Sequence, residues 1–110
     1  MPKFPWQASY TAQGAQGLQK DGGLARRAAV QRLTEQAGGK LESFYFALGE
    51  SDVYVIAELP DATTAVAVSL AVNAVGAAHL RTVPLLTAEE MDTATKKAVD
   101  YRPPGAAGKP

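Results

Sequence analysis

The residues of this 110-residue chain best suited to acid–base chemistry are its single histidine, His79, and a carboxylate that opens a strand-like segment, Asp52. Histidine titrates near neutral pH, and an aspartate beside a tyrosine can act as a general base. Asp52, His79 and Tyr54 are therefore the candidate catalytic residues. The alternatives are that Asp52 caps the turn from Gly49 to Asp52 through backbone N–H groups, and that His79 is an ordinary surface residue. We favour these structural roles.

Nucleophilic and metal chemistry find little support in the sequence. There is no GxSxG segment that would place an activated serine on a sharp turn. The chain contains no cysteine, which excludes disulfides and thiolate metal centres. One histidine with scattered carboxylates lacks the spacing of a metal site. We therefore expect neither a metal nor a cofactor.

A second set of residues suits ligand binding rather than catalysis. Aromatic residues can line an apolar pocket, with phenol groups as polar contacts, and the chain offers Trp6, Tyr10, Tyr45 and Tyr54 for this use. Packing in a core or an interface is the commoner role of such residues, and we favour it. The candidate ligand-binding residues are Tyr10, Tyr45, Tyr54 and Arg81.

The segment from Gly22 to Arg27 offers a separate possibility. A glycine turn that leads into a helix N-terminus can hold an anion, and Arg26 or Arg27 would add charge-assisted hydrogen bonds. The usual explanation for such a pair is a solvated helix face, and the spacing is not that of a P-loop.

Composition indicates one globular domain, with 46% hydrophobic and 20% charged residues. Eleven basic residues balance eleven acidic ones, whereas a nucleic-acid-binding surface normally has a basic excess. The first residues do not resemble a signal peptide, and the most apolar segment, AVAVSLAVNAVGAA, is too short to span a bilayer. We expect a cytoplasmic protein that binds neither nucleic acid nor membrane.

The expected elements alternate between strands and helices. Periodicity and turn residues predict strands over 4–10, 41–48, 53–59 and 78–85, and helices from 13 to a break at 20–23, from 24 to 37, over 62–75 and over 88–98. Asp61 is the expected N-cap of the third helix, and Thr87 with Glu90 forms a capping box for the last. Because proline lacks an N–H, Pro5 places the start of the first strand at an edge of the sheet or beyond the ladder.

With right-handed crossovers, this order gives an α+β, ferredoxin-like βαββαβ fold. Its four-stranded antiparallel sheet carries two helices on one face, and an extra C-terminal helix follows. We expect one domain over residues 1–104 and a flexible tail over 105–110.

Strand alternation assigns side chains to the two faces of this sheet. Val53, Val55, Ala57 and Leu59 suit the face covered by helices. The other face is predicted to combine Tyr45, Tyr54, Ile56, His79 and Arg81, with Leu41 and Ser43 on the side of Tyr45.

The uncovered face predicts a partner. Four strands of about seven residues at about 4.8 Å spacing form a plane of roughly 400 Å², close to the limit for an exposed patch on a monomer. We therefore expect a homodimer that pairs the open sheet faces, with a higher oligomer as a further possibility. The rival arrangement folds the terminal helix over the same face.

Four segments carry a resemblance to a known family: SYTAQG, DGGLARRAAVQRL, GGKLESFYFALGESDVYVIAELPD and PLLTAEEMD. They resemble the GYD-domain family of small bacterial proteins, which belongs to the dimeric α/β-barrel superfamily. The Gly–Tyr–Asp signature of that family corresponds to Gly49, Ser51 and Asp52, so a serine replaces the tyrosine. The resemblance implies a fold and a dimer rather than a reaction.

These observations favour a small dimeric binding module that uses a cleft between helices and sheet. The first alternative, implied by the superfamily, is a cofactor-free enzyme of monooxygenase or isomerase type acting on a small aromatic or oxidised metabolite. The second alternative is a structural subunit of a larger oligomer.

Overall fold

The computed structural model describes residues 1–105, so the predicted tail, apart from Gly105, lies outside the described residues. Eight elements follow one another along the chain: β1 Lys3–Tyr10, α1 Ala12–Asp21, α2 Gly23–Gln36, β2 Lys40–Phe46, β3 Val53–Glu58, α3 Ala62–Val75, β4 Ala78–Thr82 and α4 Ala88–Thr95.

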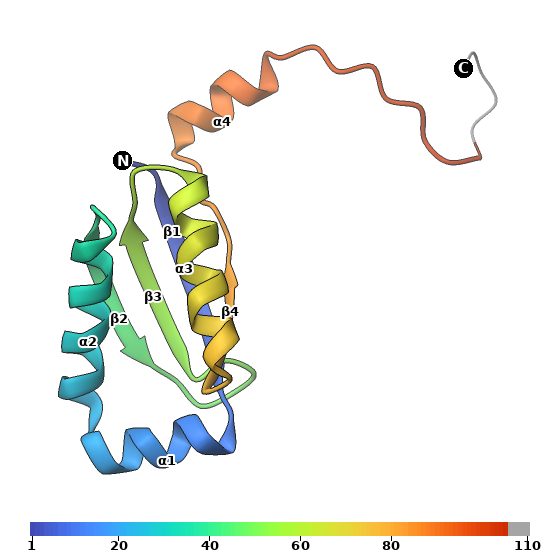
Figure 1. The fold of residues 1–110 in the computed structure, drawn as a ribbon. Coiled ribbons are helices and arrows are strands. Elements are labelled where there is room, and N and C mark those ends of the chain that lie inside the picture. Colours follow the sequence, from blue (N-terminus) through green and yellow to red (C-terminus); the bar gives the residue numbers. More distant parts are fainter. Residues whose placement is uncertain (106–110) are drawn as a thin grey trace.

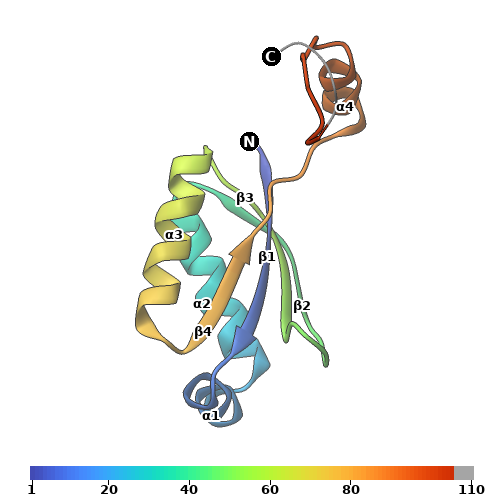
Figure 2. The same ribbon diagram turned by 90° about the vertical axis from the view of Figure 1, so that its right-hand side faces the viewer.

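The four strands form one antiparallel sheet in the order β2-β3-β1-β4. Helices α2 and α3 cover one face of this sheet, and α1 crosses the end at which β1 finishes (Figures 1 and 2). The predicted ferredoxin-like α+β fold is therefore confirmed. None of the helices within residues 1–105 has the length and apolar character needed to cross a bilayer.

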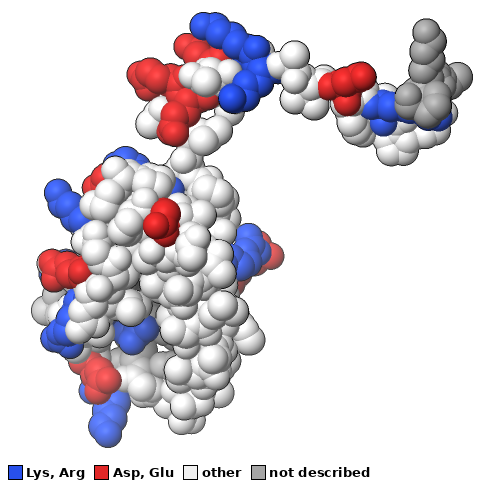
Figure 3. All heavy atoms as spheres, turned by 45° about the horizontal axis from the view of Figure 1, so that its top comes forward, with Lys and Arg blue, Asp and Glu red and all other residues white. Residues whose placement is uncertain are grey.

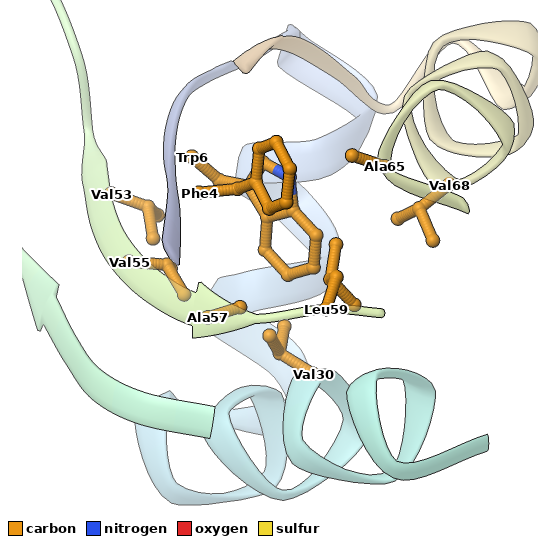
Figure 4. Close-up of a cluster of buried hydrophobic side chains, with 9 residues drawn as sticks. All are labelled: Phe4, Trp6, Val30, Val53, Val55, Ala57, Leu59, Ala65 and Val68. Atoms are coloured by element: carbon orange, nitrogen blue, oxygen red, sulfur yellow. The ribbon is translucent and has the colours of Figure 1, made fainter. Parts of the chain in front are cut away.

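The hydrophobic core lies between the sheet and its two covering helices (Figure 4). Trp6 and Leu59 are 3% and 0% exposed, and Val68 of α3 packs against them in the same cluster. The predicted inward set of β3 is confirmed: Val53, Val55, Ala57 and Leu59 are all buried. Thr34 is the buried polar residue of α2, and its hydroxyl donates to the Val30 carbonyl at 2.8 Å.

One face assignment was wrong because β2 contains a register shift. Leu41 pairs with Ala57, whereas Ser43 pairs with Ile56, so an extra residue stands between them. A bulge of this kind resets the alternation of a strand. Leu41 consequently packs against the core, and only Ser43 shares the face of Tyr45.

The second of the two positions predicted for Pro5 is confirmed: β1 is a central strand, but its end at Pro5 lies beyond the ladder with β4. Pro5 pairs with Ile56 on β3, while on the other side its carbonyl oxygen accepts the Val83 N–H at 3.1 Å. The regular pairing of β4 ends one residue earlier, at Thr82. The missing N–H therefore lies where the ladder with β4 has ended, and no ladder bond is lost.

Local capping follows the sequence closely. Asp61 Oδ1 accepts the Thr64 N–H at 2.8 Å, and this bond lowers the pKa of Asp61 from its ordinary value. The capping box of Thr87 and Glu90 is present at the start of α4. Gly22, at φ 86°, separates α1 from α2 as the predicted break requires.

The chain after β4 leaves the body of the domain. The Leu85 N–H still donates to the Lys3 carbonyl at 3.1 Å, but α4 then stands beyond the end of the sheet (Figures 1 and 2). Every residue of α4 is exposed. The rival arrangement, in which the terminal helix covers the second sheet face, is therefore not the one observed.

Candidate ligand-binding site

A hollow of about 540 Å³ lies on the helix side of the sheet, between α1, α2 and α3. We call it the helix-side hollow. Its floor includes Tyr10 at the end of β1 and Ala78 at the start of β4. Its walls include Leu18 of α1, Leu33 of α2 and Val72 of α3. This volume falls within the range of pockets that hold small organic molecules.

Small residues create the space. Besides Gly14 and Gly17, the wall includes Ala25, Ala29 and Ala71. In interiors packed to ordinary density, larger side chains would fill such positions. The three helices therefore enclose a volume that their own side chains do not occupy.

The two glycines of α1 have different tasks. A Cβ atom on Gly14 would overlap the carbonyl oxygen of Ala77, so only glycine lets α1 lie this close to the chain before β4. The Thr11 N–H donates to the same Ala77 oxygen at 3.1 Å and fixes the start of α1 there. A Cβ atom on Gly17, in contrast, would meet no atom within 4 Å. Gly14 thus allows the close approach of α1 to Ala77, and Gly17 adds no side chain to the wall of the hollow.

A second cavity of about 50 Å³ extends from the hollow toward the core. Both cavities are lined by Tyr10, Arg26 and Leu33, and the inner one reaches Trp6 and Phe44. The indole Nε1–H of Trp6 is buried and has no hydrogen-bond partner among residues 1–105. Buried donors are normally paired, so this unpaired N–H in a residue that lines the inner cavity is an exception.

Arg26 supplies a cation to both cavities. It lies near the start of α2 and is half-buried. No hydrogen bond or ion pair joins its guanidinium to any residue of the described chain. Asp21, the last residue of α1, also lines the hollow and is exposed. The site therefore combines apolar walls with one unpaired guanidinium, one carboxylate and the phenol of Tyr10.

The opposite face of the sheet has a different character. Tyr45, Tyr54, Gln7 and Arg81 form one cross-strand row, and Ser43, Ile56 and Pro5 form the next. We call this side the open face. Arg81 Nη2 donates to Gln7 Oε1 at 3.3 Å.

The four predicted ligand-binding residues are consequently split between the two sides. Tyr10 alone lines the helix-side hollow. Tyr45, Tyr54 and Arg81 share the open face, as strand alternation predicts, and cannot reach the same ligand as Tyr10 through the sheet. Within residues 1–105, no three histidine, aspartate or glutamate side chains gather closely enough to hold a metal ion.

Comparison with known families gives one clear match. The family model described as the GYD domain matches residues 4–95, from β1 to the end of α4. The chain belongs to the GYD domain family. No curated protein and no solved structure matches it. The matched region contains every residue that lines the helix-side hollow.

Asp52, in the segment that corresponds to the signature of the GYD domain family, has a structural contact that differs from the one expected. Its carboxylate accepts the backbone N–H of Tyr10 at 2.9 Å, and its own N–H donates to the Ala8 carbonyl at 2.8 Å. The proposed capping of its own turn was therefore wrong, because the acceptor serves β1 instead. Asp52 ties the β2–β3 hairpin to the strand that carries Tyr10 into the hollow.

The candidate catalytic residues of this GYD domain are not joined to one another. His79 is exposed and pairs across the sheet with Ser9, whose hydroxyl donates to the Glu50 carbonyl at 2.6 Å. Within residues 1–105, no hydrogen bond links Asp52, Tyr54 and His79. An activated nucleophile or base is normally oriented by such bonds. The catalytic roles of these residues stay predictions.

Trp6, Arg26 and Gly17, which line the hollow or the inner cavity, did not enter the predicted ligand-binding set. Trp6 was weighed as a pocket-lining aromatic, but packing was favoured for it. Arg26 was considered for an anion site at a helix terminus rather than for the wall of a cavity. Gly17 carried a usable signal: together with Gly14 it places two glycines inside one helix, at about 1 kcal/mol each relative to alanine. Such a cost indicates that space or close approach is needed there.

Proposed function

We propose that this GYD domain is a small-molecule-binding module whose ligand occupies the helix-side hollow. The observation that carries the proposal is the volume of about 540 Å³ enclosed by three helices. Its apolar walls and the unpaired polar groups of Arg26 and Trp6 are the usual ingredients of a ligand pocket.

The apolar lining of the hollow supports the same proposal. The hollow is open to solvent on one side, so its apolar wall atoms face water when nothing is bound. A bound molecule with an apolar part covers these atoms, and their removal from water favours binding.

A cavity-filling variant tests this location. Gly17 lines the hollow, and a Cβ atom there would meet no atom within 4 Å, so the backbone leaves room for Gly17→Leu. Helix propensity favours leucine over glycine, so the variant is expected to match or exceed the parent in stability by up to about 1 kcal/mol. It should lose the rise in melting temperature that ligands of the hollow produce.

Ala15→Leu is the matched control, because Ala15 is an exposed residue of the same helix that does not line the hollow. The measurement is a thermal-shift screen of the parent and both variants with small aromatic acids, amides and quinones at millimolar concentration. Ligands that stabilise the parent and Ala15→Leu but not Gly17→Leu support the proposal. Equal stabilisation of all three proteins would place binding elsewhere.

We further propose that the module is a homodimer through the open face. This face carries Tyr54 and Ile56 on the inner strand β3 and Tyr45 on the edge strand β2, and the two tyrosines are 44% and 69% exposed. The ion pair of Lys3 with Glu42 joins β1 to β2 near the start of β1. A two-fold interface would bury the tyrosines and leave charges of both signs at its rim, which is the usual anatomy of such contacts.

Tyr54→Lys tests the dimer. A central tyrosine is a frequent hot spot, so a charge in its place should weaken dimerisation by at least about thirtyfold. Tyr101→Lys is the control, since Tyr101 lies in the segment after α4 and is 71% exposed. Sedimentation equilibrium should give a dimer for the parent and the control, and a monomer for Tyr54→Lys. A monomeric parent at micromolar concentration would end this part of the proposal. The cytoplasmic location expected from the sequence stays a prediction.

A further inference from the structure

We infer that the ligand of the helix-side hollow is an amphipathic monocarboxylic acid whose carboxylate binds the guanidinium of Arg26. This inference rests on the proposed function, because it names the class of molecule that the hollow receives. The apolar part of the acid would lie against Leu33 and Val72, which line both cavities.

The polar groups of the two cavities favour a ligand with acceptor atoms. Arg26 and Tyr10 line both cavities, and Trp6 lines the inner one. Arginine has donors and no acceptor, and the tryptophan indole is a donor only. Arg26 and Trp6 are both unpaired within the described chain. Tyr10 adds a hydroxyl that can donate as well. A ligand rich in donors, such as an amine, would leave Arg26 and Trp6 without partners.

The environment of Arg26 favours a full negative charge over a neutral acceptor. A half-buried guanidinium has lost part of its hydration, and within residues 1–105 no carboxylate forms an ion pair with it. The planar fork of arginine matches a carboxylate in two parallel hydrogen bonds, and such charge-assisted bonds are roughly twice as strong as neutral ones.

Asp21 sets the upper limit on ligand charge. Its carboxylate lines the same hollow, and within the described chain it forms no ion pair with Arg26. The two side chains together give the wall no net charge. A dianion such as a phosphate monoester would therefore carry one charge that faces Asp21 without compensation, whereas a monoanion would be balanced by Arg26.

The single tryptophan of the chain makes the inference directly measurable. Trp6 lines the inner cavity, so occupation of the site should change its fluorescence. The experiment titrates the full chain with 3-phenylpropionate and 4-phenylbutyrate, and separately with the corresponding primary amides, which have the same shape but no charge. The parent, Arg26→Gln, Arg26→Lys and the control Arg27→Gln are compared. Arg27 is exposed and lines neither cavity.

The expected result is that the parent and Arg27→Gln bind the acids at least about tenfold more tightly than the amides. Arg26→Gln should bind acid and amide alike, and Arg26→Lys should retain part of the preference because it keeps the charge without the fork. Thermal unfolding of each variant confirms that it is folded.

Other outcomes separate the inference from the proposed function. Equal binding of acids and amides by the parent, with loss of both in Gly17→Leu, would overturn the inference and leave the binding site in place. A preference for acids that survives in Arg26→Gln would also overturn it. If neither series changes the fluorescence of Trp6 at millimolar concentration, both the inference and the proposed site fail.

Discussion

The two faces of the sheet differ in how far their side chains are buried. On the helix side, side chains such as Val55 and Leu59 are 4% and 0% exposed, and the core gives way to a hollow only where α1 meets the sheet. On the open face, Tyr45 of a neighbouring strand is 69% exposed. The first face is covered by helices that leave a hollow beside it, and the second face exposes large aromatic side chains.

This difference indicates different partners. A hollow with an unpaired guanidinium suits a small molecule, whereas a broad surface with exposed tyrosines suits another protein surface. The outer side of α3 belongs to neither face. Its sequence from Ala62 to Val75 contains no charged residue, and Figure 3 shows the largely uncharged surface that results.

The largest effect should come from comparing a buried leucine with an exposed tyrosine. Leu59→Ala should lower the free energy of unfolding by about 2–5 kcal/mol, because it leaves a cavity in a fully buried site. Tyr45→Thr, which places a residue of good strand propensity in β2, should change the free energy of unfolding by less than about 0.5 kcal/mol. The free energies of unfolding of both variants are measured with urea in the Tyr54→Lys background, which removes the expected dimer. Equal losses of stability in the two variants would contradict the difference in burial between the two faces.

A smaller effect is expected at Asp52, which joins the hairpin to β1. Asp52→Ala removes the acceptor of the partly buried Tyr10 N–H and should cost about 1–3 kcal/mol. Asp52→Asn keeps an acceptor oxygen and should cost less. Because Tyr10 lines the hollow, the alanine variant should also weaken ligand binding. Equal unfolding midpoints for the parent and Asp52→Ala would show that this bond contributes nothing.

The smallest effect concerns Asp61 at the start of α3, and it depends on pH. The hydrogen bonds from Thr64 lower the pKa of Asp61 below its ordinary value of 3.8. A carboxylate with a lowered pKa in the folded state contributes stability above the unfolded pKa and loses it as the pH falls through the folded value.

Asp61→Ala should therefore be less stable than the parent at pH 7, and the two proteins should converge as the pH falls below 3.8. Unfolding midpoints collected across that range provide the measurement. Asp92→Ala, in the exposed α4, is the control and should show no such convergence. A constant difference between parent and Asp61→Ala at every pH would exclude the charge as its cause.

The sequence predicted the fold and the caps because both depend on local patterns. Alternation in β3 identified the buried valines, and Asp61 and the capping box at Thr87 lie where their side chains satisfy the first N–H groups of a helix. The bulge at Leu41 could not be predicted, since an extra residue in one strand is visible only in its pairing with another.

Of the four candidate ligand-binding residues, Tyr10 alone lines the helix-side hollow, although a cleft between helices and sheet was expected. The hollow arises where α1, α2 and α3 meet. Many of its lining residues are glycines and alanines, which have no reactive or charged side chain and are therefore not identified as functional residues from sequence. Arg26 stood out as a charge, but its position beside a cavity depends on how α1 turns back at Gly22. Aromatic type alone placed Tyr45 and Tyr54 with Tyr10, and the sheet separates them.

One measurement tests most directly whether a small molecule binds on the helix side of the sheet and not on the open face. It is a titration of the ¹⁵N-labelled chain with 3-phenylpropionate, followed by the single indole N–H resonance of Trp6 and by the backbone amides. The account predicts shifts at the indole and at Gly17, with Tyr45 and Tyr54 unmoved. Shifts at the two tyrosines with an unchanged Trp6 indole would place the ligand on the open face and contradict it.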